Sequence, residues 1–159
     1  MEQDVDELRG ALARLASGVV VVCGRAAQGY RGLTATSFTG VALDPPLVLV
    51  CLDTLTATRD AIIDGGAFTA SVLERRQEFL AERFSGRAPL VDPSWREVPH
   101  DLSPRGLPVV RGCIAWLECA VEDTHEAGDH EIVIGRVEAT SRGPGDPLVL
   151  WDRDFWGLA

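Results

Sequence analysis

The sequence contains no lysine, and arginine supplies all 15 of its Lys and Arg side chains. This absence excludes a Walker-type phosphate loop, whose lysine contacts the phosphates, and a lysine Schiff base to pyridoxal phosphate. Acidic residues number 24, so the formal net charge is −9 at pH 7. The resulting negative electrostatic field repels the phosphate backbone of nucleic acids, so we do not expect a nucleic acid to be the main partner. Any anionic ligand needs a local pocket.

Long apolar runs and several well-known motifs are also missing. No run approaches the roughly 20 residues of a membrane helix, and the acidic start MEQDVDELRG lacks the basic-then-apolar order of a secretory signal. Neither G-x-G-x-x-G nor G-x-S-x-G occurs, which argues against a Rossmann dehydrogenase and an α/β-hydrolase. We expect a single domain over residues 1–159, located in the cytoplasm, without membrane association.

The four cysteines form no C-x-x-C pair and lie in apolar stretches, which is typical of core thiols. They are Cys23, Cys51, Cys113 and Cys119. Cys113 and Cys119 could share one face of a strand, but six residues at about 3.3 Å each separate them too far for a disulfide. We expect neither a structural disulfide nor a zinc site.

Periodicity predicts a short helix followed by many strands. Asp4 and Glu7 are placed like a capping box, and five apolar residues behind Asp4 are spaced as one helix face: Val5, Leu8, Ala11, Leu12 and Leu15. Strands are expected at 18–24, 32–44, 47–52, 67–73, 113–125 and 130–140, with 47–52 buried on both faces. Helices are expected within 53–66 and 74–84, and 86–111 reads as an irregular excursion that packs through Trp95. Together, these predicted elements indicate a mostly antiparallel β-barrel with a few helices.

The first candidate site is the stretch from Gly32 to Phe38, which contains the run from Thr34 to Ser37. Small residues, three of them with hydroxyls (Thr34, Ala35, Thr36 and Ser37), let a flat ligand approach the backbone while polar groups contact its edge. An edge strand with a solvated Thr and Ser face is the competing interpretation.

The second candidate site lies between a predicted buried strand and a predicted helix, from Asp53 to Arg59. Hydroxyls, free helix amides and the Arg59 guanidinium could converge there on a phosphate. The competing interpretation makes Thr58 an ordinary helix cap, with Thr54 and Thr56 exposed.

Two further segments carry polar or aromatic side chains. Arg83, Phe84 and Ser85 could clasp a ring or a pyrophosphate, although Phe84 also suits a plain core position. His125 and His130 flank a hydrophilic turn in which no third histidine or cysteine ligand lies nearby in sequence, so we expect no metal there. His130 suits the mouth of a ligand site, and His125 suits simple exposure.

Taken in order, these segments resemble the flavin reductase-like family, the reductase components of two-component flavin-dependent monooxygenases. The strings that carry the resemblance span nearly the whole chain: LASGVVVVC, GLTATSFTGVALDPPLVLVCLD, AFTASVL, FLAERFSG, WLECAVEDTHEAGDHEIVIGRV and DPLVLWDRDFWGL. The resemblance implies an FMN-binding split β-barrel, antiparallel and Greek-key-like with a few peripheral helices.

The resemblance also implies a function and a set of site residues. The protein would be a homodimeric enzyme that transfers a hydride from NADH or NADPH to FMN or FAD and delivers reduced flavin to a partner monooxygenase. Its flavin ring would lie on Thr34, Ala35, Thr36 and Ser37, with the wall continued by Cys51, Leu52 and Asp53. Thr56 and Thr58 would hold the phosphate, Arg83, Phe84 and Ser85 would close on the flavin, and His130 would lie near the nicotinamide.

Two other functions stay open at this point. Arg31, Thr36 and Thr54 stand where the family often has histidine, asparagine and a basic residue, which leaves room for an oxidase with fixed flavin or an enzyme acting on a pathway intermediate. The second open function is that of a non-catalytic protein that binds flavin or a protein partner. Ile114 and Trp116 are apolar positions expected to point outward and could form its interface.

Overall fold

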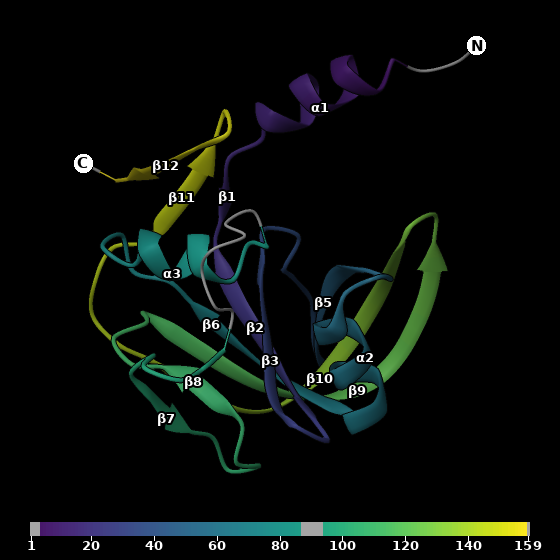
Figure 1. Cartoon of the computed structure of the whole chain (residues 1–159), viewed down its shortest axis with the longest axis vertical. Coiled ribbons are helices and arrows are strands. Elements are labelled where there is room, and N and C mark those ends of the chain that lie inside the picture. The colour runs from purple at the N-terminus through teal and green to yellow at the C-terminus, as the bar shows by residue number, and fades with distance from the viewer. Residues whose placement is uncertain (1–3, 87–93, 159) are drawn as a thin grey trace.

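The structure is a computed structural model that describes residues 4–86 and 94–158, and most of its regular elements are strands (Figure 1). The main sheet has seven antiparallel strands in the order β3-β2-β6-β9-β10-β5-β4. Their bounds are β2 Val20–Ala26, β3 Gly29–Ala35, β4 Thr39–Leu43, β5 Pro46–Asp53, β6 Ala67–Val72, β9 Ala115–Ala127 and β10 His130–Arg142. Within the described ranges no hydrogen-bonded ladder joins the edge strands β3 and β4, so the β-rich antiparallel prediction is confirmed while the barrel is open rather than closed.

Two small sheets and three helices surround the main sheet. One small sheet has the order β1-β11-β12, and the other pairs β7 with β8. Their bounds are β1 Ser17–Gly18, β11 Leu148–Trp151, β12 Asp154–Gly157, β7 His100–Leu102 and β8 Pro108–Val110, and the helices are α1 Val5–Ala13, α2 Ala57–Gly65 and α3 Glu78–Arg83. In the described ranges, no helix has both the length and the apolar character needed to cross a membrane.

The core has two layers, one on each face of β2. Val21 and Cys23 point into a cluster with Phe84 and Trp95 under α3. The alternate residues of β2 point into a second cluster, around Phe68 and Ile62 under α2. Strand β2 is therefore buried on both faces, and so is β6. The same prediction for 47–52 is wrong, because β5 alternates between buried and half-buried positions and leaves one face available to a ligand.

Helix α2 lies close against β2 because Gly24 has no side chain. A Cβ at Gly24 would come within 2.8 Å of an Ile62 side-chain carbon and 2.9 Å of the Ile62 backbone nitrogen. The helix begins at Thr56, whose hydroxyl accepts from the Arg59 N–H, and ends at Gly66, which has a φ of 71°. The predicted glycine stop is confirmed. The helix cap, however, is Thr56 and not Thr58.

Several other predicted boundaries change. The hairpin is confirmed, since His130 pairs with Ala127 across a two-residue turn. The segment 32–44 is two strands, β3 and β4, interrupted at 36–38. The helix predicted within 74–84 is shorter, and the excursion 86–111 includes β7 and β8. Residues 87–93 of that excursion lie outside the described residues. Trp95 is buried, as predicted.

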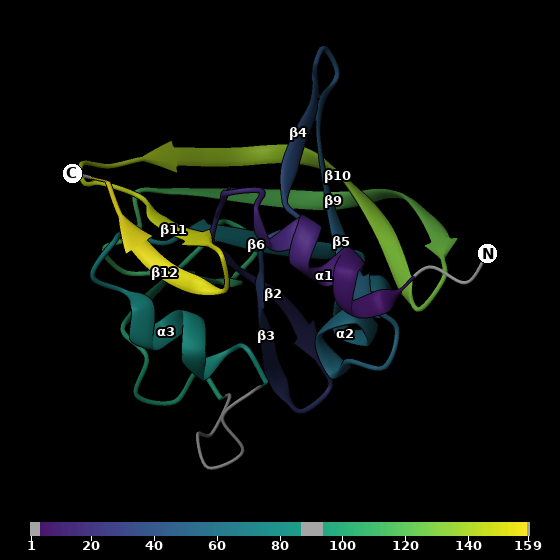
Figure 2. The same cartoon turned by 90° about the horizontal axis from the view of Figure 1, so that it is seen from above.

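Helix α1 begins at the predicted cap, where the Asp4 carboxylate accepts from the Asp6 and Glu7 N–H groups. Its apolar face does not reach the core, because no residue of α1 is buried. The helix stands off the main sheet beside β11 and β12 (Figures 1 and 2). Arg14, which caps its end, packs over the Trp151 ring at 4.8 Å from the ring centroid.

All four cysteines are free, and only two of them are core thiols. Cys23 and Cys119 are fully buried, and burial raises the pKa of each thiol to about 12. Cys51 and Cys113 are half-buried. The core prediction therefore holds for Cys23 and Cys119 alone.

Candidate functional site

A cavity of about 440 Å³ is lined by the end of β3, the end of β5, the start of β10 and the loop that leads into α2. Nine of the thirteen predicted site residues line it: Thr34, Ala35, Thr36, Ser37, Cys51, Asp53, Thr56, Ser85 and His130. They come from four separate parts of the sequence. The fold therefore brings most of the predicted site into one place.

The wall from Thr34 to Ser37 is held in position by bonds to both of its neighbours. The Thr34 N–H donates to the Phe84 carbonyl at 3.0 Å, and the Thr34 hydroxyl donates to the Ala81 carbonyl at 2.7 Å. The Ser37 hydroxyl donates to the Cys51 carbonyl and accepts from the Cys51 N–H. Since Thr36 is exposed and no described residue bonds to its hydroxyl, it is the group of this wall most available to a ligand.

The loop between β5 and α2 is closed on itself by its polar side chains. The Asp53 carboxylate accepts from the Leu55 N–H at 2.8 Å, and the Thr56 hydroxyl donates to the Asp53 carbonyl at 2.9 Å. The Thr54 N–H and hydroxyl both donate to the Asp129 carbonyl, at 3.1 Å each. The loop and the β9–β10 turn are therefore joined directly.

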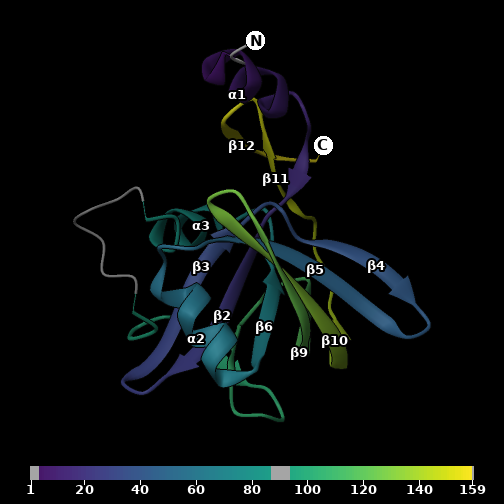
Figure 3. The same cartoon turned by 90° about the vertical axis from the view of Figure 1, so that its right-hand side faces the viewer.

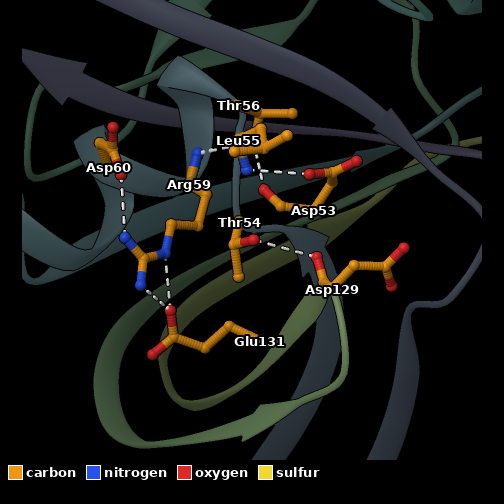
Figure 4. A network of polar contacts seen from close by, with 8 residues as sticks. All are labelled: Asp53, Thr54, Leu55, Thr56, Arg59, Asp60, Asp129 and Glu131. Atoms are coloured by element: carbon orange, nitrogen blue, oxygen red, sulfur yellow. Dashed lines mark hydrogen bonds and ion pairs between the residues drawn. The ribbon is translucent and has the colours of Figure 1, made fainter.

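Arg59 does not point at a free phosphate position (Figure 4). Its guanidinium forms an ion pair with Glu131 through Nη2 and Nε, the second at 2.6 Å, and a further pair with Asp60 at 2.9 Å. The hydrogen bonds that Arg59 donates to Asp60 and Glu131 raise the Arg59 pKa above its ordinary value. The expectation that Arg59 converges on a phosphate is wrong in this arrangement, because two carboxylates already occupy the guanidinium.

His130 stands at the rim of the cavity with its side chain about half exposed. Its Nδ1 lies 2.7 Å from an Asp129 carboxylate oxygen. This hydrogen bond holds the pKa of the Asp129 carboxyl below its ordinary value. Nε2 of the ring is left as the nitrogen that can meet a second molecule. His125 is largely exposed beside Asp123, and the described residues contain no group of three side chains suited to hold a metal ion.

Four predicted site residues lie outside the cavity lining. The Leu52 and Phe84 side chains belong to the two core clusters. Thr58 is buried and donates to the Gly32 carbonyl at 3.0 Å. The Arg83 guanidinium donates to the backbone carbonyls of Ser94 and Arg96. These residues support the cavity walls from behind.

Sequence reasoning gave no role to two residues of this region. Leu33, which is part of the first candidate stretch, lines the cavity, and the alternation along β3 could have placed it on the same face as Ala35. Glu131 is buried opposite Leu52 on β5, where its carboxylate meets Arg59. A charged residue among the apolar residues of a predicted strand was the available signal for Glu131.

The cavity suits a flat ligand with a polar edge. Its walls are small side chains and backbone, and its polar groups are hydroxyls, one carboxylate and one histidine. Neither of the two predicted arginines, Arg59 and Arg83, lines it. An anionic part of a ligand would therefore meet the Thr36 hydroxyl and backbone amides here rather than a guanidinium.

A large, open antiparallel sheet with a cavity at its strand ends places the protein in the mostly-β class. The chain belongs to the flavin reductase like domain family, whose domain matches residues 12–159.

Relatives and solved structures agree with this membership. The chain is 38% identical to an NADH-dependent flavin reductase of a Rhodococcus species over 157 residues, which cover 95% of this chain and 85% of that protein. It is 36% identical over 151 residues to the reductase component of 4-hydroxyphenylacetate 3-monooxygenase from Thermus thermophilus, covering 94% of each. The NADH:FAD oxidoreductase of Streptomyces globisporus C-1027 matches with a TM-score of 0.91 and 34% identity over 100% of this chain and 96% of that one.

Proposed function

We propose that this protein is an NAD(P)H:flavin oxidoreductase that supplies reduced flavin to a separate monooxygenase. The observation that carries the proposal is the cavity, which gathers nine predicted flavin-site residues on a fold shared with flavin reductases. Relatives named as an NADH-dependent flavin reductase and as the reductase component of a monooxygenase support the same reaction.

The chemistry asks the protein chiefly to hold two rings in position. Hydride transfer from nicotinamide C4 to flavin N5 is a reaction that the two bound cofactors supply themselves. In the proposal, the run from Thr34 to Ser37 supports one face of the flavin ring and Cys51 and Asp53 continue that wall. His130, at the open rim, contacts the nicotinamide through Nε2.

The weak anion-binding character of the cavity favours a flavin that exchanges over one that stays bound. Arg59 is held by Glu131 and Asp60, and Arg83 is held by backbone carbonyls. The Thr56 hydroxyl already donates to the Asp53 carbonyl. The flavin phosphate is therefore left with backbone amides at the start of α2, which form weaker bonds than a guanidinium does. A reductase that delivers its product to another enzyme requires such exchange.

Three finer points belong to the same proposal. The active form is a homodimer, the partner is a flavin-dependent oxygenase, and the protein works in the cytoplasm. Exposed apolar side chains on α1 support the homodimer. The relative from Thermus thermophilus, itself a reductase component, supports the oxygenase partner.

The test is a steady-state assay of NADH or NADPH oxidation with FMN or FAD added to the purified protein. We expect rapid loss of absorbance at 340 nm that depends on added flavin, and a flavin that is removed by gel filtration. If neither NADH nor NADPH is oxidised in the presence of FMN or of FAD, the proposal is overturned. A yellow protein that keeps its flavin through gel filtration and does not turn over added flavin would favour the fixed-flavin alternative.

A further inference from the structure

A second and larger hollow, of about 630 Å³, lies beside the flavin cavity. It is a groove between the β2–β3 hairpin and one face of α2, and the site described above does not use it. The hairpin and the helix lie side by side in Figure 3. Arg25 and Arg31 line its hairpin side, and Asp60 and Asp64 line its helix side.

The groove and the cavity adjoin at the first residues of α2. Thr56 lines the cavity, and the next residue, Ala57, lines the groove. On β3, Leu33 lines the cavity and Arg31, two residues earlier on the same face of the strand, lines the groove. A ligand longer than the flavin ring and its first phosphate can therefore pass from one hollow into the other along the start of α2.

Arg31 gives the groove an available positive charge. Across 4–86 and 94–158, no acidic group lies within 4.0 Å of its guanidinium, which donates only to the carbonyl of its neighbour Tyr30. Arg25, by contrast, donates to the carbonyls of Arg105 and Gly106. In a chain of net charge −9, an arginine without an acidic partner that lines a groove favours an anionic ligand such as a phosphate.

The remaining lining suits a nucleoside. Ala26, Ala27, Ala57 and Ala61 form small apolar walls that admit a planar base. The Asp64 carboxylate has no hydrogen bond or ion pair from the described residues and can accept from ribose hydroxyls, a contact that carboxylates make in dinucleotide sites. Asp60 is paired with Arg59 and contributes less.

We propose that this groove binds the adenosine monophosphate half of FAD, with Arg31 on its phosphate and Asp64 on its ribose. FAD, and not FMN, is then the flavin that this protein prefers, because FMN has no group to fill the groove. This inference rests on the proposed function, and it names the flavin that the reaction uses.

The test compares the two flavins in Arg31→Gln. Removal of a charged hydrogen bond to the phosphate raises the ratio of KM for FAD to KM for FMN about tenfold relative to wild type. Ala27→Glu, at an exposed position of the groove, raises the same ratio by placing a negative charge beside the phosphate. Arg142→Gln removes the same charge from an exposed position at the end of β10 and leaves the ratio unchanged. Dissociation constants for both flavins, measured by quenching of flavin fluorescence, give the same ratio independently of turnover.

Each other outcome has a distinct meaning. An unchanged ratio in both groove variants overturns the inference while the reductase function stands. A raised KM for NADH with FMN as acceptor assigns the groove to the adenylate half of NADH and also overturns it. If wild type oxidises neither dinucleotide, the proposed function fails, and the fluorescence ratio alone then decides whether the groove binds FAD. Binding of neither flavin overturns both.

Discussion

At the scale of single residues, the two buried thiols make stability depend on alkaline pH. Burial raises the pKa of Cys23 and Cys119 from 9.0 to about 12. Between those values the folded protein keeps a proton on each sulfur that the unfolded chain has lost. The free energy of unfolding is unaffected by these thiols below pH 9 and falls above it, by about 1.4 kcal/mol per pH unit for each thiol.

We expect this fall to be smaller in Cys119→Ala. Urea unfolding in a reducing buffer, from pH 8 to 10.5, measures the slope of the free energy against pH. Val133→Ala, a change in the same core cluster that keeps both thiols, has the wild-type slope and controls for the lost packing. A Cys119→Ala slope equal to that of wild type contradicts the prediction.

The residue scale also separates what sequence could and could not predict about the site. Small hydroxylated residues in a run marked one wall, and alternation along β5 places Cys51 and Asp53 at the cavity and Leu52 in the core. Arg59 looked free because its partner Glu131 is 72 residues away in sequence. Local patterns show which side chains are able to bind an anion, but not which are already paired through the fold.

At the scale of elements, the β5–α2 loop and the β9–β10 turn are expected to behave as one unit. Arg59 joins α2 to β10 through Glu131, and the Thr54 N–H donates to the Asp129 carbonyl in the turn. Glu131→Gln removes the ion pair. The Thr54 amide then exchanges its hydrogen faster, because the loop and the turn separate more often.

Hydrogen exchange followed by mass spectrometry over 53–57 and 127–131 measures this change. Glu122→Gln is the matched control, since it breaks the pair with Arg136 in the same hairpin without touching α2. We expect Glu131→Gln to raise the flavin KM as well, while Glu122→Gln leaves it unchanged. Equal exchange in the two variants would mean that the ion pair does not hold the loop.

Elements with strong local signals were the ones that sequence predicted best. The capped helix α1, the glycine-terminated helix α2 and the β9–β10 hairpin all carry their start and stop residues in the sequence. The short strands β7, β8, β11 and β12 were not predicted. Their pairing depends on partners brought close by the fold, such as β1 against β11, and two to four residues are too few to show a period.

At the scale of the whole molecule, the exposed apolar side chains do not lie where an interface was expected. Ile114 and Trp116 are half-buried rather than fully exposed. The apolar face of α1 is exposed instead, with Val5, Leu8, Leu12 and Leu15 between 44% and 73% accessible. The periodicity predicted this apolar face correctly. A single sequence does not reveal whether such a face packs against the core of the same chain or against a second chain.

The proposed homodimer gives this face a partner, since an exposed apolar helix face is costly in water and typical of an interface. The β4–β5 hairpin also projects from the main sheet and carries Leu43 at 96% exposure (Figures 2 and 3). Size-exclusion chromatography with light scattering is expected to give twice the chain mass of 17.1 kDa. In a variant with both Leu8→Glu and Leu12→Glu, two charges on the α1 face shift the species to a single chain.

The control for this variant is a second double change of the same charge on a different surface. Leu102→Glu combined with Phe79→Glu alters exposed apolar positions on β7 and α3, away from α1 and the β4–β5 hairpin, and keeps the wild-type mass. If the α1 variant keeps the doubled mass while the control loses it, the interface lies on the β7 and α3 side. A single-chain mass for wild type at micromolar concentration removes the homodimer from the proposal. The flavin assay is then interpreted for a monomer.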